Sequence, residues 1–366
     1  MKKVAVFLPG LIFLLFCFGF SILHHALPDK SFSEQENREL ALSPALSLSS
    51  FLSGDWTREY ETYLADQFPF RNTFVTVKAG TELALGKTEL SGIYICKDGL
   101  LAAKFEKPDD NRVRLNTAAI AAFAEKVNVP VYFTVVPGIT ALWADRLPEN
   151  APNPDQLALV DQIAASAGAA IYVDTKAALL QKVNEPIYYT TDHHWTTLGA
   201  YYGYEALANA MGLEPQALPN PYKTFSHFYG TSSSSAGIAP GEGDTVTLYI
   251  PDEGMTLTVG NEEKPLYDMS FAEKKDKYSV FLGGNYPLAV LKTGQKDLPK
   301  LLLVKDSYAN AEIPFLAAHF SEIHIVDPRF YRQSLSSYVE ENQIEQVVVS
   351  FYLVNFVTDN NIALIK

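Results

Sequence analysis

The first pattern along the chain is an uninterrupted apolar run from Val4 to Leu23, preceded by Lys2 and Lys3. Its length matches the roughly 20 residues that a helix needs to cross a bilayer. The run is longer than the apolar core of a typical signal peptide, and no small-residue cleavage site follows it. It therefore predicts a membrane helix over residues 1–27 and favours an uncleaved signal anchor over a cleaved signal peptide. With the lysines kept in the cytoplasm, the rest of the chain is exported.

The next segments are more polar and then helical. Residues 28–54 are rich in serine, which is typical of a stalk or linker. Apolar residues at helical spacing predict a helical lead-in over residues 55–89, with one helix from about Trp56 and another from Arg71 to Leu85. Lys97-Asp98-Gly99 separates two short apolar stretches, and this arrangement predicts a β-hairpin.

From about residue 90, helical patterns alternate with short apolar runs. We expect helices at 111–127, 155–167, 175–183, 198–211 and 308–320. We expect strands at 129–136, 170–173, 301–304, 323–326 and 346–351. Continuous runs such as LLLV and VVVSF indicate strands that are buried on both faces of a parallel sheet. The chain therefore belongs to the α/β class, with one main domain over residues 90–366.

One region interrupts this alternation. Between about residues 214 and 295 the sequence predicts a flexible serine-rich loop at 232–235 and strands at 246–250, 256–259 and 278–282. We interpret this region as a β insertion within the α/β domain.

Charge and cysteine content narrow the class of function. The 366 residues carry a formal net charge of -13, which argues against a nucleic-acid partner because phosphate neutralisation needs clustered cations. Only two cysteines occur, and Cys17 falls within the apolar N-terminal run, so an intrachain disulfide with Cys96 is not expected. An exported protein that avoids disulfides fits a bacterium better than a eukaryotic secretory pathway.

The densest chemistry lies in Asp192-His193-His194-Trp195, directly before a predicted helix. An aspartate and a histidine two residues apart on a loop can form a hydrogen bond that fixes the imidazole tautomer. We interpret Asp192 as the orienting acid and His194 as the general base of a serine-nucleophile site. Trp195 could stack on a sugar ring, but a large aromatic residue beside a helix start more often packs under the loop.

Ser307 is the candidate nucleophile. It follows the predicted strand at 301–304 and precedes a helical pattern, and ligands of α/β sheets gather at the carboxyl ends of strands. Backbone N–H groups at such a turn can stabilise an oxyanion. Taken alone, Asp306 or Ser307 would be read as a helix cap. The acid–base pair is what favours catalysis.

Two further patterns bear on the site. Gly283-Gly284-Asn285 offers donors for an oxyanion hole, with an ordinary turn as the alternative. Adjacent histidines also raise the possibility of a metal, but no further ligand stands at usual zinc spacing, so neither a metal nor another cofactor is expected.

The chain resembles a known family through these residues: Asp192-His193-His194-Trp195, residues 33–40 (SEQENREL), residues 66–71 (DQFPFR), Gly283-Gly284-Asn285 and Asp306-Ser307-Tyr308. They are similar to the DHHW family of bacterial proteins, which in turn resembles the SGNH-hydrolase-like domains of alginate O-acetylation proteins. The resemblance implies a three-layer, flavodoxin-like domain in which a D-x-H-W motif supplies acid and base and a later serine is the nucleophile. It implies Asp192, His194 and Ser307 in those roles, gives none to His193, and places Tyr352 and Asn355 near the site.

We therefore expect a membrane-anchored, extracytoplasmic acyltransferase or esterase. The resemblance implies a cell-surface or secreted polysaccharide as the substrate, and we expect the acyl group to be acetyl. A membrane acyl-donor protein is a possible partner, and a further alternative is that the chain is a structural partner of such a protein, with little activity alone. The triad does not distinguish transfer from hydrolysis, because that depends on whether the pocket excludes water. The alternative from another class is a non-catalytic glycan-binding or assembly protein of a polysaccharide-modifying system.

Overall fold

The computed structural model describes residues 2–33 and 38–365. The chain forms two compact units. The smaller contains residues 1–90 together with 234–238, and the larger contains residues 91–233 and 239–366. The domain boundaries expected at residues 27, 54 and 89 stay predictions.

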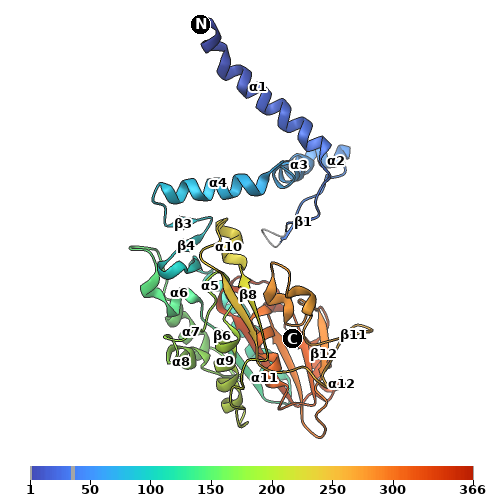
Figure 1. Ribbon diagram of the computed structural model, residues 1–366. Coiled ribbons are helices and arrows are strands. Elements are labelled where there is room, and N and C mark those ends of the chain that lie inside the picture. Colours follow the sequence, from blue (N-terminus) through green and yellow to red (C-terminus); the bar gives the residue numbers. More distant parts are fainter. Residues whose placement is uncertain (1, 34–37, 366) are drawn as a thin grey trace. The chain divides into compact units, whose positions relative to one another are not determined.

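The smaller unit is mostly helical (Figure 1). Its elements are α1 (Lys2–Ala26), β1 (Phe32–Ser33), β2 (Arg38–Glu39), α2 (Leu48–Ser53), α3 (Asp55–Asp66), α4 (Arg71–Ala84) and β3 (Glu89–Leu90). Within α1, the stretch Leu8–Ala26 is long and apolar enough to cross a membrane.

The side chains of Asp66 and Gln67 form hydrogen bonds with the segment between α1 and α2. Arg38 donates two hydrogen bonds to Asp66, at 3.0 and 2.5 Å, and the Ala41 N–H donates to the same carboxylate at 2.9 Å. The side chain of Gln67 bridges Lys30 and Ala41. These contacts involve two of the stretches on which the family resemblance was based. Residues 34–37 of the first stretch lie outside the described part of the chain.

The larger unit is built on an eight-stranded sheet with the order β11-β10-β12-β14-β13-β15-β6-β7, counted over the described residues. Its strands are β6 (Val131–Val136), β7 (Ile171–Tyr172), β10 (Thr256–Val259), β11 (Glu262–Lys264), β12 (Leu288–Lys292), β13 (Lys300–Lys305), β14 (Glu322–Val326) and β15 (Gln346–Tyr352). The pairs from β14 through β7 are parallel, whereas β12, β10 and β11 add on antiparallel. The sheet is therefore mixed. The expected parallel arrangement holds for β14 through β7 and does not extend to β12, β10 and β11.

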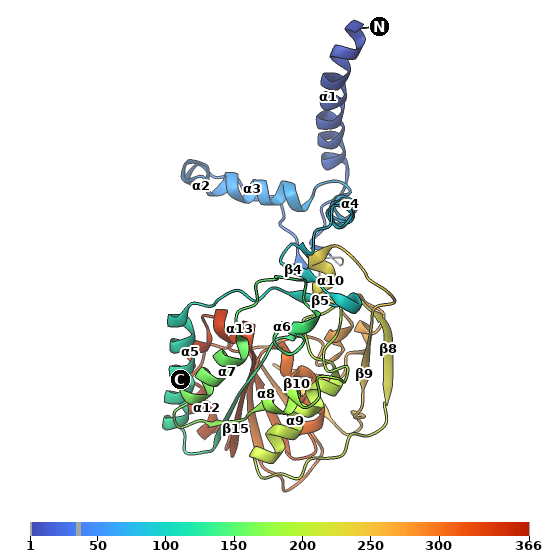
Figure 2. The ribbon, with the colours of Figure 1, turned by 90° about the vertical axis from the view of Figure 1, so that its left-hand side faces the viewer.

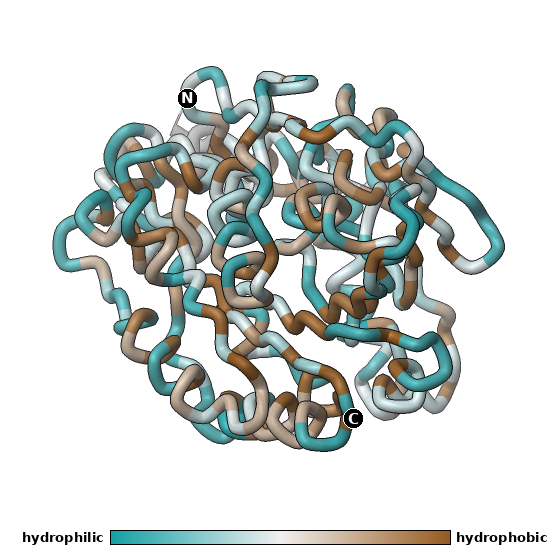
Figure 3. Tube along the Cα trace, turned by 90° about the horizontal axis from the view of Figure 1, so that it is seen from below, coloured by the Kyte–Doolittle hydropathy of each residue, from teal (hydrophilic) through white to brown (hydrophobic). Residues whose placement is uncertain are grey.

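Alternating residues of the central strands enter two different cores. Leu301 and Leu303 pack with α8 (Thr175–Leu180) and α9 (Thr197–Ala210). Leu302 and Val304 pack with α5 (Asp110–Lys126), α7 (Gln156–Ala165), α12 (Leu335–Glu341) and α13 (Leu353–Thr358). Figure 2 shows α5 and α12 on one side of the strands and α8 and α9 on the other. The hydrophobic stretches run through the interior of this unit, with hydrophilic loops at its rim (Figure 3). Helices therefore cover both faces, as the continuous apolar strands require.

The predicted β insertion needs correction. Among the strands of this region, β8 (Lys223–Phe228) and β9 (Asp244–Leu248) form a separate two-stranded sheet, whereas β10, β11 and β12 extend the main sheet. The expected strand at 278–282 is instead the 3-10 helix η4 (Lys277–Val280), because the Asp276 side chain accepts a hydrogen bond from Ser279 N–H and starts a helical turn. The expected loop at 232–235 lies within α10 (Thr231–Ala236).

The helix expected at 308–320 is also wrong in form. It is a 3-10 helix, η5 (Ser307–Ala311), followed by the short α11 (Ile313–Leu316). Pro314 lacks an N–H and stands at the start of α11, so one continuous helix cannot pass through this position. The remaining elements of the larger unit are β4 (Ile93–Ile95) and β5 (Leu101–Ala103), which form the predicted hairpin, α6 (Ile139–Leu142) and four 3-10 turns: η1 (Lys97–Gly99), η2 (Ala144–Arg146), η3 (Met269–Phe271) and η6 (Ile362–Leu364).

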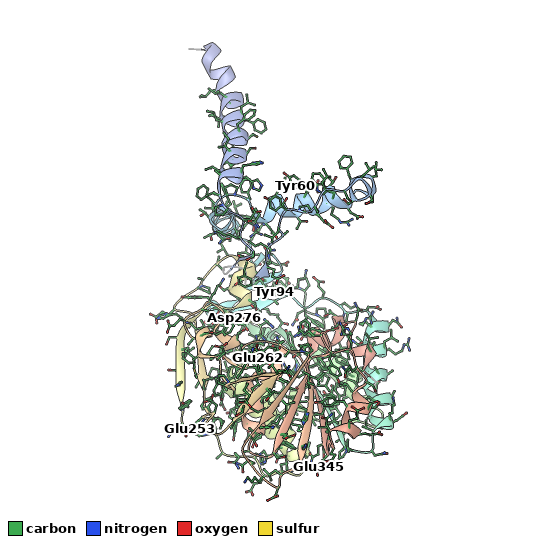
Figure 4. The ribbon with its side chains drawn as sticks, turned by 90° about the vertical axis from the view of Figure 1, so that its right-hand side faces the viewer. Tyr60, Tyr94, Glu253, Glu262, Asp276 and Glu345 are labelled. Carbon is green, nitrogen blue, oxygen red and sulfur yellow. The ribbon has the colours of Figure 1, made fainter. Side chains whose placement is uncertain are left out.

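The sheet determines where the chemistry gathers. Glu345, labelled in Figure 4, directly precedes β15 and marks the edge of the sheet where that strand begins. Ser307 follows β13, and Asn355 follows β15, at the opposite edge. Because β13 and β15 are parallel neighbours, these residues meet there.

Candidate active site

The loop between α8 and α9 is folded into a tight turn. Tyr188 and Trp195 form an isolated antiparallel bridge, so the residues between them project as a loop. Asp244, the first residue of β9, accepts hydrogen bonds from the backbone N–H and the hydroxyl of both Thr190 and Thr191, at 2.6 to 2.9 Å. One carboxylate therefore fixes the backbone immediately before Asp192.

The Asp192 carboxylate is buried and fully hydrogen-bonded. Its Oδ1 accepts from His194 Nδ1 at 2.6 Å and from the His194 backbone N–H at 2.9 Å. Its Oδ2 accepts from the N–H and the hydroxyl of Thr231, at 2.7 and 2.9 Å. Burial alone would raise the pKa of Asp192, but the two neighbouring histidines and these hydrogen bonds outweigh burial and lower the pKa below its ordinary value. Asp192 is therefore an anion at neutral pH.

His194 links this carboxylate to the serine. Because Asp192 can only accept, His194 Nδ1 carries a proton, and Nε2 then offers a lone pair. The Ser307 hydroxyl lies 2.9 Å from Nε2, which is hydrogen-bond distance, and it is the donor. The structure thus brings together Asp192, His194 and Ser307, although Ser307 lies 115 positions after Asp192 in the sequence. A neutral imidazole in this arrangement can accept the hydroxyl proton as the oxygen attacks a carbonyl carbon.

Two rings hold the imidazole of His194 in place. The ring of Tyr278 stacks on it with a centroid distance of 3.8 Å, and the ring of His193 lies 3.9 Å from it. Two rings this close cannot share one face, so they cover opposite faces of His194. His193 also contacts Thr231 through Nδ1 at 2.5 Å. Since the Thr231 hydroxyl donates to Asp192, it accepts from His193. Burial lowers the pKa of His193 to about 4, which keeps this ring neutral at neutral pH.

The turn that carries Ser307 is held from both sides. Asp306 accepts from Tyr308 N–H at 2.9 Å, and so caps the turn, and also accepts from Tyr352 N–H and Asn355 Nδ2 at 2.9 and 2.8 Å. The capping interpretation and the catalytic interpretation are therefore compatible, because Asp306 caps while Ser307 points to His194. Ser307 itself is only partly buried, so its hydroxyl remains reachable.

Tyr352 lies at this turn as expected, but its ring stacks on Tyr308 with a centroid distance of 4.2 Å and is largely buried. Trp195 has no exposed surface, and its Nε1 donates to the Tyr308 carbonyl at 2.8 Å. The inclusion of Trp195 among the substrate-binding candidates is therefore wrong. It is a packing residue, which was the preferred interpretation of the two.

The Gly283-Gly284-Asn285 turn lies against the segment that carries the serine. Three consecutive residues have positive φ, namely Leu282 (67°), Gly283 (72°) and Gly284 (139°), and only glycine adopts the last value readily. The Oδ1 of Asn285 accepts from Lys305 Nζ at 2.8 Å and from Asn310 Nδ2 at 3.4 Å. These contacts tie Asn285 to residues on both sides of Ser307. An oxyanion role for Gly284 and Asn285 stays a prediction.

Asp192, His193 and His194 bring three ligand-type atoms within 4.8 Å of one another. Their donor chemistry fits a metal poorly. Both Asp192 oxygens accept hydrogen bonds from the protein, and His194 Nδ1 donates its proton to one of them. A metal bound to these atoms would have to replace the hydrogen bonds that order the loop. The arrangement suits proton transfer better than coordination.

Several residues of the site carry no recognisable signal in the sequence. Thr231 and Asp244 lie 39 or more positions from the Asp192 loop, and a lone threonine or aspartate in a loop is too common to single out. Tyr278 was placed in a strand, yet its hydroxyl donates to the carbonyls of Ser307 and Tyr308 at 2.9 and 3.0 Å. Lys305 stands at the end of a strand, where lysine is normally exposed.

Comparisons with known proteins agree with the family resemblance. Residues 160–326 match the family model described as "DHHW protein". A crystal structure of a DHHW family protein from Eubacterium siraeum is 29% identical, with a TM-score of 0.64, and the match covers 75% of this chain and 95% of that one. PatB1 from Bacillus cereus, solved with a sulfonyl adduct, shares the fold at 21% identity and a TM-score of 0.60, over 75% of this chain and 98% of that one.

A curated relative is the probable alginate O-acetylase AlgJ of Pseudomonas syringae pv. tomato, which is 25% identical over 214 residues. That match covers 56% of this chain and 52% of the relative, so the chain spans about half the length of the curated relative. The resemblance to the DHHW family and the homology to an alginate O-acetylation protein are thereby confirmed.

Proposed function

Because residues 160–326 match the DHHW family model, we propose that this chain is a serine-dependent acyltransferase or esterase of the SGNH-hydrolase-like class, acting on a polysaccharide outside the cytoplasm. One observation carries the proposal. His194 Nδ1 lies 2.6 Å from Asp192 Oδ1, and His194 Nε2 lies 2.9 Å from Ser307 Oγ. The donors and acceptors of these two hydrogen bonds are arranged as nucleophilic catalysis needs. The N-terminal apolar helix supports the extracytoplasmic location, as a signal anchor.

In the first half-reaction, Ser307 Oγ forms a bond to the ester carbonyl carbon while its proton passes to His194 Nε2. The carbonyl oxygen becomes an oxyanion, and the imidazolium is stabilised by Asp192. Collapse of the tetrahedral intermediate breaks the bond to the leaving alcohol oxygen, which takes the proton from His194. The acyl group, which we propose is acetyl, then resides on Ser307 as an ester.

In the second half-reaction, a hydroxyl group attacks the acyl-serine and gives its proton to His194. The new ester or acid leaves as Ser307 recovers that proton. If the hydroxyl belongs to a sugar, the reaction is a transfer, and if it belongs to water, the reaction is hydrolysis. The homology to an alginate O-acetylase supports transfer of acetyl to a cell-surface or secreted polysaccharide. We propose a membrane-bound acyl-donor protein as the partner that supplies the acyl group.

The test compares p-nitrophenyl acetate hydrolysis by the full chain, purified in detergent, with that of Ser307→Ala. We expect kcat to fall by about 10³-fold or more, because the substitution removes the attacking atom. Ser337→Ala is the matched control, because Ser337 is an exposed serine on α12. It should keep the kcat of the unchanged protein.

Equal rates for the unchanged protein and Ser307→Ala, with both folded by circular dichroism, would contradict the enzyme proposal. That outcome would favour the glycan-binding or assembly protein of the alternative interpretation, which predicts retention on immobilised polysaccharide without Ser307-dependent turnover.

A further inference from the structure

Lys305 is a buried cation beside the turn that carries Ser307. It is the last residue of β13, its side chain is 1% exposed, and the segment from Lys305 to Asn310 contains the serine. Its Nζ donates to Asn310 Oδ1 at 2.6 Å and to Asn285 Oδ1 at 2.8 Å. In the described part of the chain, it makes no ion pair within 4 Å. A lysine buried at this cost, next to the candidate nucleophile, requires a physical reason.

The ammonium group determines which way the Asn285 amide faces. An amide has one acceptor end and one donor end, and Lys305 can only donate, so Asn285 Oδ1 must face Nζ. Asn310 Nδ2 donates to the same oxygen, at 3.4 Å. The Asn285 Nδ2 therefore faces the opposite way, and no described residue accepts a hydrogen bond from it. Asn285 is also only partly buried, so this donor is available to a bound molecule.

The same contact affects how strongly Asn285 can donate. A positive charge 2.8 Å from the amide oxygen polarises the amide and makes its Nδ2–H a better donor. Burial lowers the pKa of Lys305 to about 8, while Asp327 and Asp306 raise it in part, so the group remains mostly charged at neutral pH. The low dielectric that makes the ammonium costly also strengthens its field at the amide.

We propose that Lys305 is a positioning residue, which fixes and polarises Asn285 so that Asn285 Nδ2 donates to the oxyanion formed when Ser307 attacks. The inference rests on the proposed function and adds a residue behind the reacting atoms. Lys305 does not touch the substrate, and its effect passes through Asn285. Asn310 is the second anchor, because its Oδ1 accepts a hydrogen bond from the ammonium at 2.6 Å.

A double-mutant cycle tests the coupling. The full chain in detergent is assayed with p-nitrophenyl acetate as Lys305→Met, Asn285→Ala and the double variant. Loss of one oxyanion-hole donor costs about 10²- to 10³-fold in kcat, so we expect that loss in Asn285→Ala. We expect Lys305→Met to lower kcat by about 10-fold or more, with KM changed by less than about twofold, because the interaction forms in the transition state. In the Asn285→Ala background, Lys305→Met should lower kcat by less than about twofold, since coupled residues are not additive.

Lys300→Met is the matched control, because Lys300 begins the same strand and pairs with Glu322 at 3.0 Å. It should leave kcat unchanged. Asn285→Asp keeps an acceptor for Lys305 and so preserves the buried contact, but its carboxylate has no Nδ2 donor. It should lose as much kcat as Asn285→Ala, and it keeps the donor role testable if Lys305→Met does not fold.

Two outcomes would overturn the inference. Lys305→Met could lower kcat by the same factor with or without Asn285, or Asn285→Asp could keep full kcat. Both presuppose Ser307-dependent turnover in the unchanged protein, whereas a lack of such turnover would overturn the proposed function itself.

Discussion

Replacing Asp192 by asparagine would remove one negative charge and change the shape of the site very little. The carboxylate accepts four hydrogen bonds, two from His194 and two from Thr231. An amide must turn its NH2 group toward one of these residues, so one backbone N–H loses its acceptor in either orientation. If the NH2 group faces His194, the proton moves to Nε2 and the base is lost. In both orientations, nothing anionic remains to stabilise the imidazolium.

The charge alone gives the scale of the effect. Two opposite unit charges about 4 Å apart, at an effective dielectric constant of about 20, attract each other by roughly 4 kcal/mol. At 1.36 kcal/mol for each factor of ten, this corresponds to a loss of about 10³-fold in kcat. The unfavourable tautomer adds to it, and the same substitution in a serine-protease triad costs about 10⁴-fold. We therefore expect Asp192→Asn to lower kcat between about 10³- and 10⁴-fold.

The assay is p-nitrophenyl acetate hydrolysis by the full chain, with folding checked by circular dichroism. Asp155→Asn is the matched control, because Asp155 caps α7 and asparagine caps a helix equally well. It should retain full activity. A folded Asp192→Asn protein with kcat within tenfold of the unchanged protein would refute Asp192 as the orienting acid.

The remaining predictions concern buried groups around the site. The Glu312 carboxyl is fully buried and has no hydrogen-bond partner among residues 2–33 and 38–365, and burial raises its pKa from 4.5 to about 8. The folded state thus keeps a proton that the unfolded state releases, so stability is lost as pH rises from about 4.5 to 8, by roughly 3 to 5 kcal/mol in total. Urea unfolding at pH 5 and pH 8 should show Glu312→Gln gaining stability relative to the unchanged protein at the higher pH, and a constant difference would contradict this. Gly230→Ala places a Cβ where the Asp192 carboxylate lies, so esterase kcat should fall at least tenfold, and an unchanged kcat would show that the loop yields without cost. Trp195→Phe removes the hydrogen bond to the Tyr308 carbonyl. Thermal unfolding should show that the free energy of unfolding falls by only about 1 kcal/mol, because Tyr278 still donates to that carbonyl. An unchanged free energy of unfolding would mean that the bond contributes nothing.

The parts of the fold that the sequence predicts well are those with strong local patterns. The strands around Leu302, Val348 and Phe133 are continuous apolar runs, and all three are buried on both faces, as is typical of a parallel sheet. The acid–base pair is likewise local, because Asp192 and His194 are two residues apart. Ser307 could be found because it follows one of these strands, and the topology of a parallel sheet brings strand ends together.

The parts that the sequence does not predict depend on distant contacts. Strands β10 and β12 are short and partly polar, and nothing in their own residues tells whether they form a separate sheet or extend the main one. Thr231 becomes part of the site only because the tertiary fold brings it to Asp192. Lys305 resembles an ordinary surface residue at a strand end. Its ammonium can be buried because two asparagines accept hydrogen bonds from it: Asn285, which is distant in sequence, and Asn310, across the turn.

The central claim is that Ser307 carries the acyl group during turnover. The most direct measurement is mass spectrometry of the full chain after a brief acid quench of its reaction with p-nitrophenyl acetate. The chain should gain one acetyl group, peptide mapping should place it on Ser307, and the group should be lost when the protein is returned to neutral pH. Acetylation of other residues only, or an equal amount on Ser307→Ala, would contradict the claim.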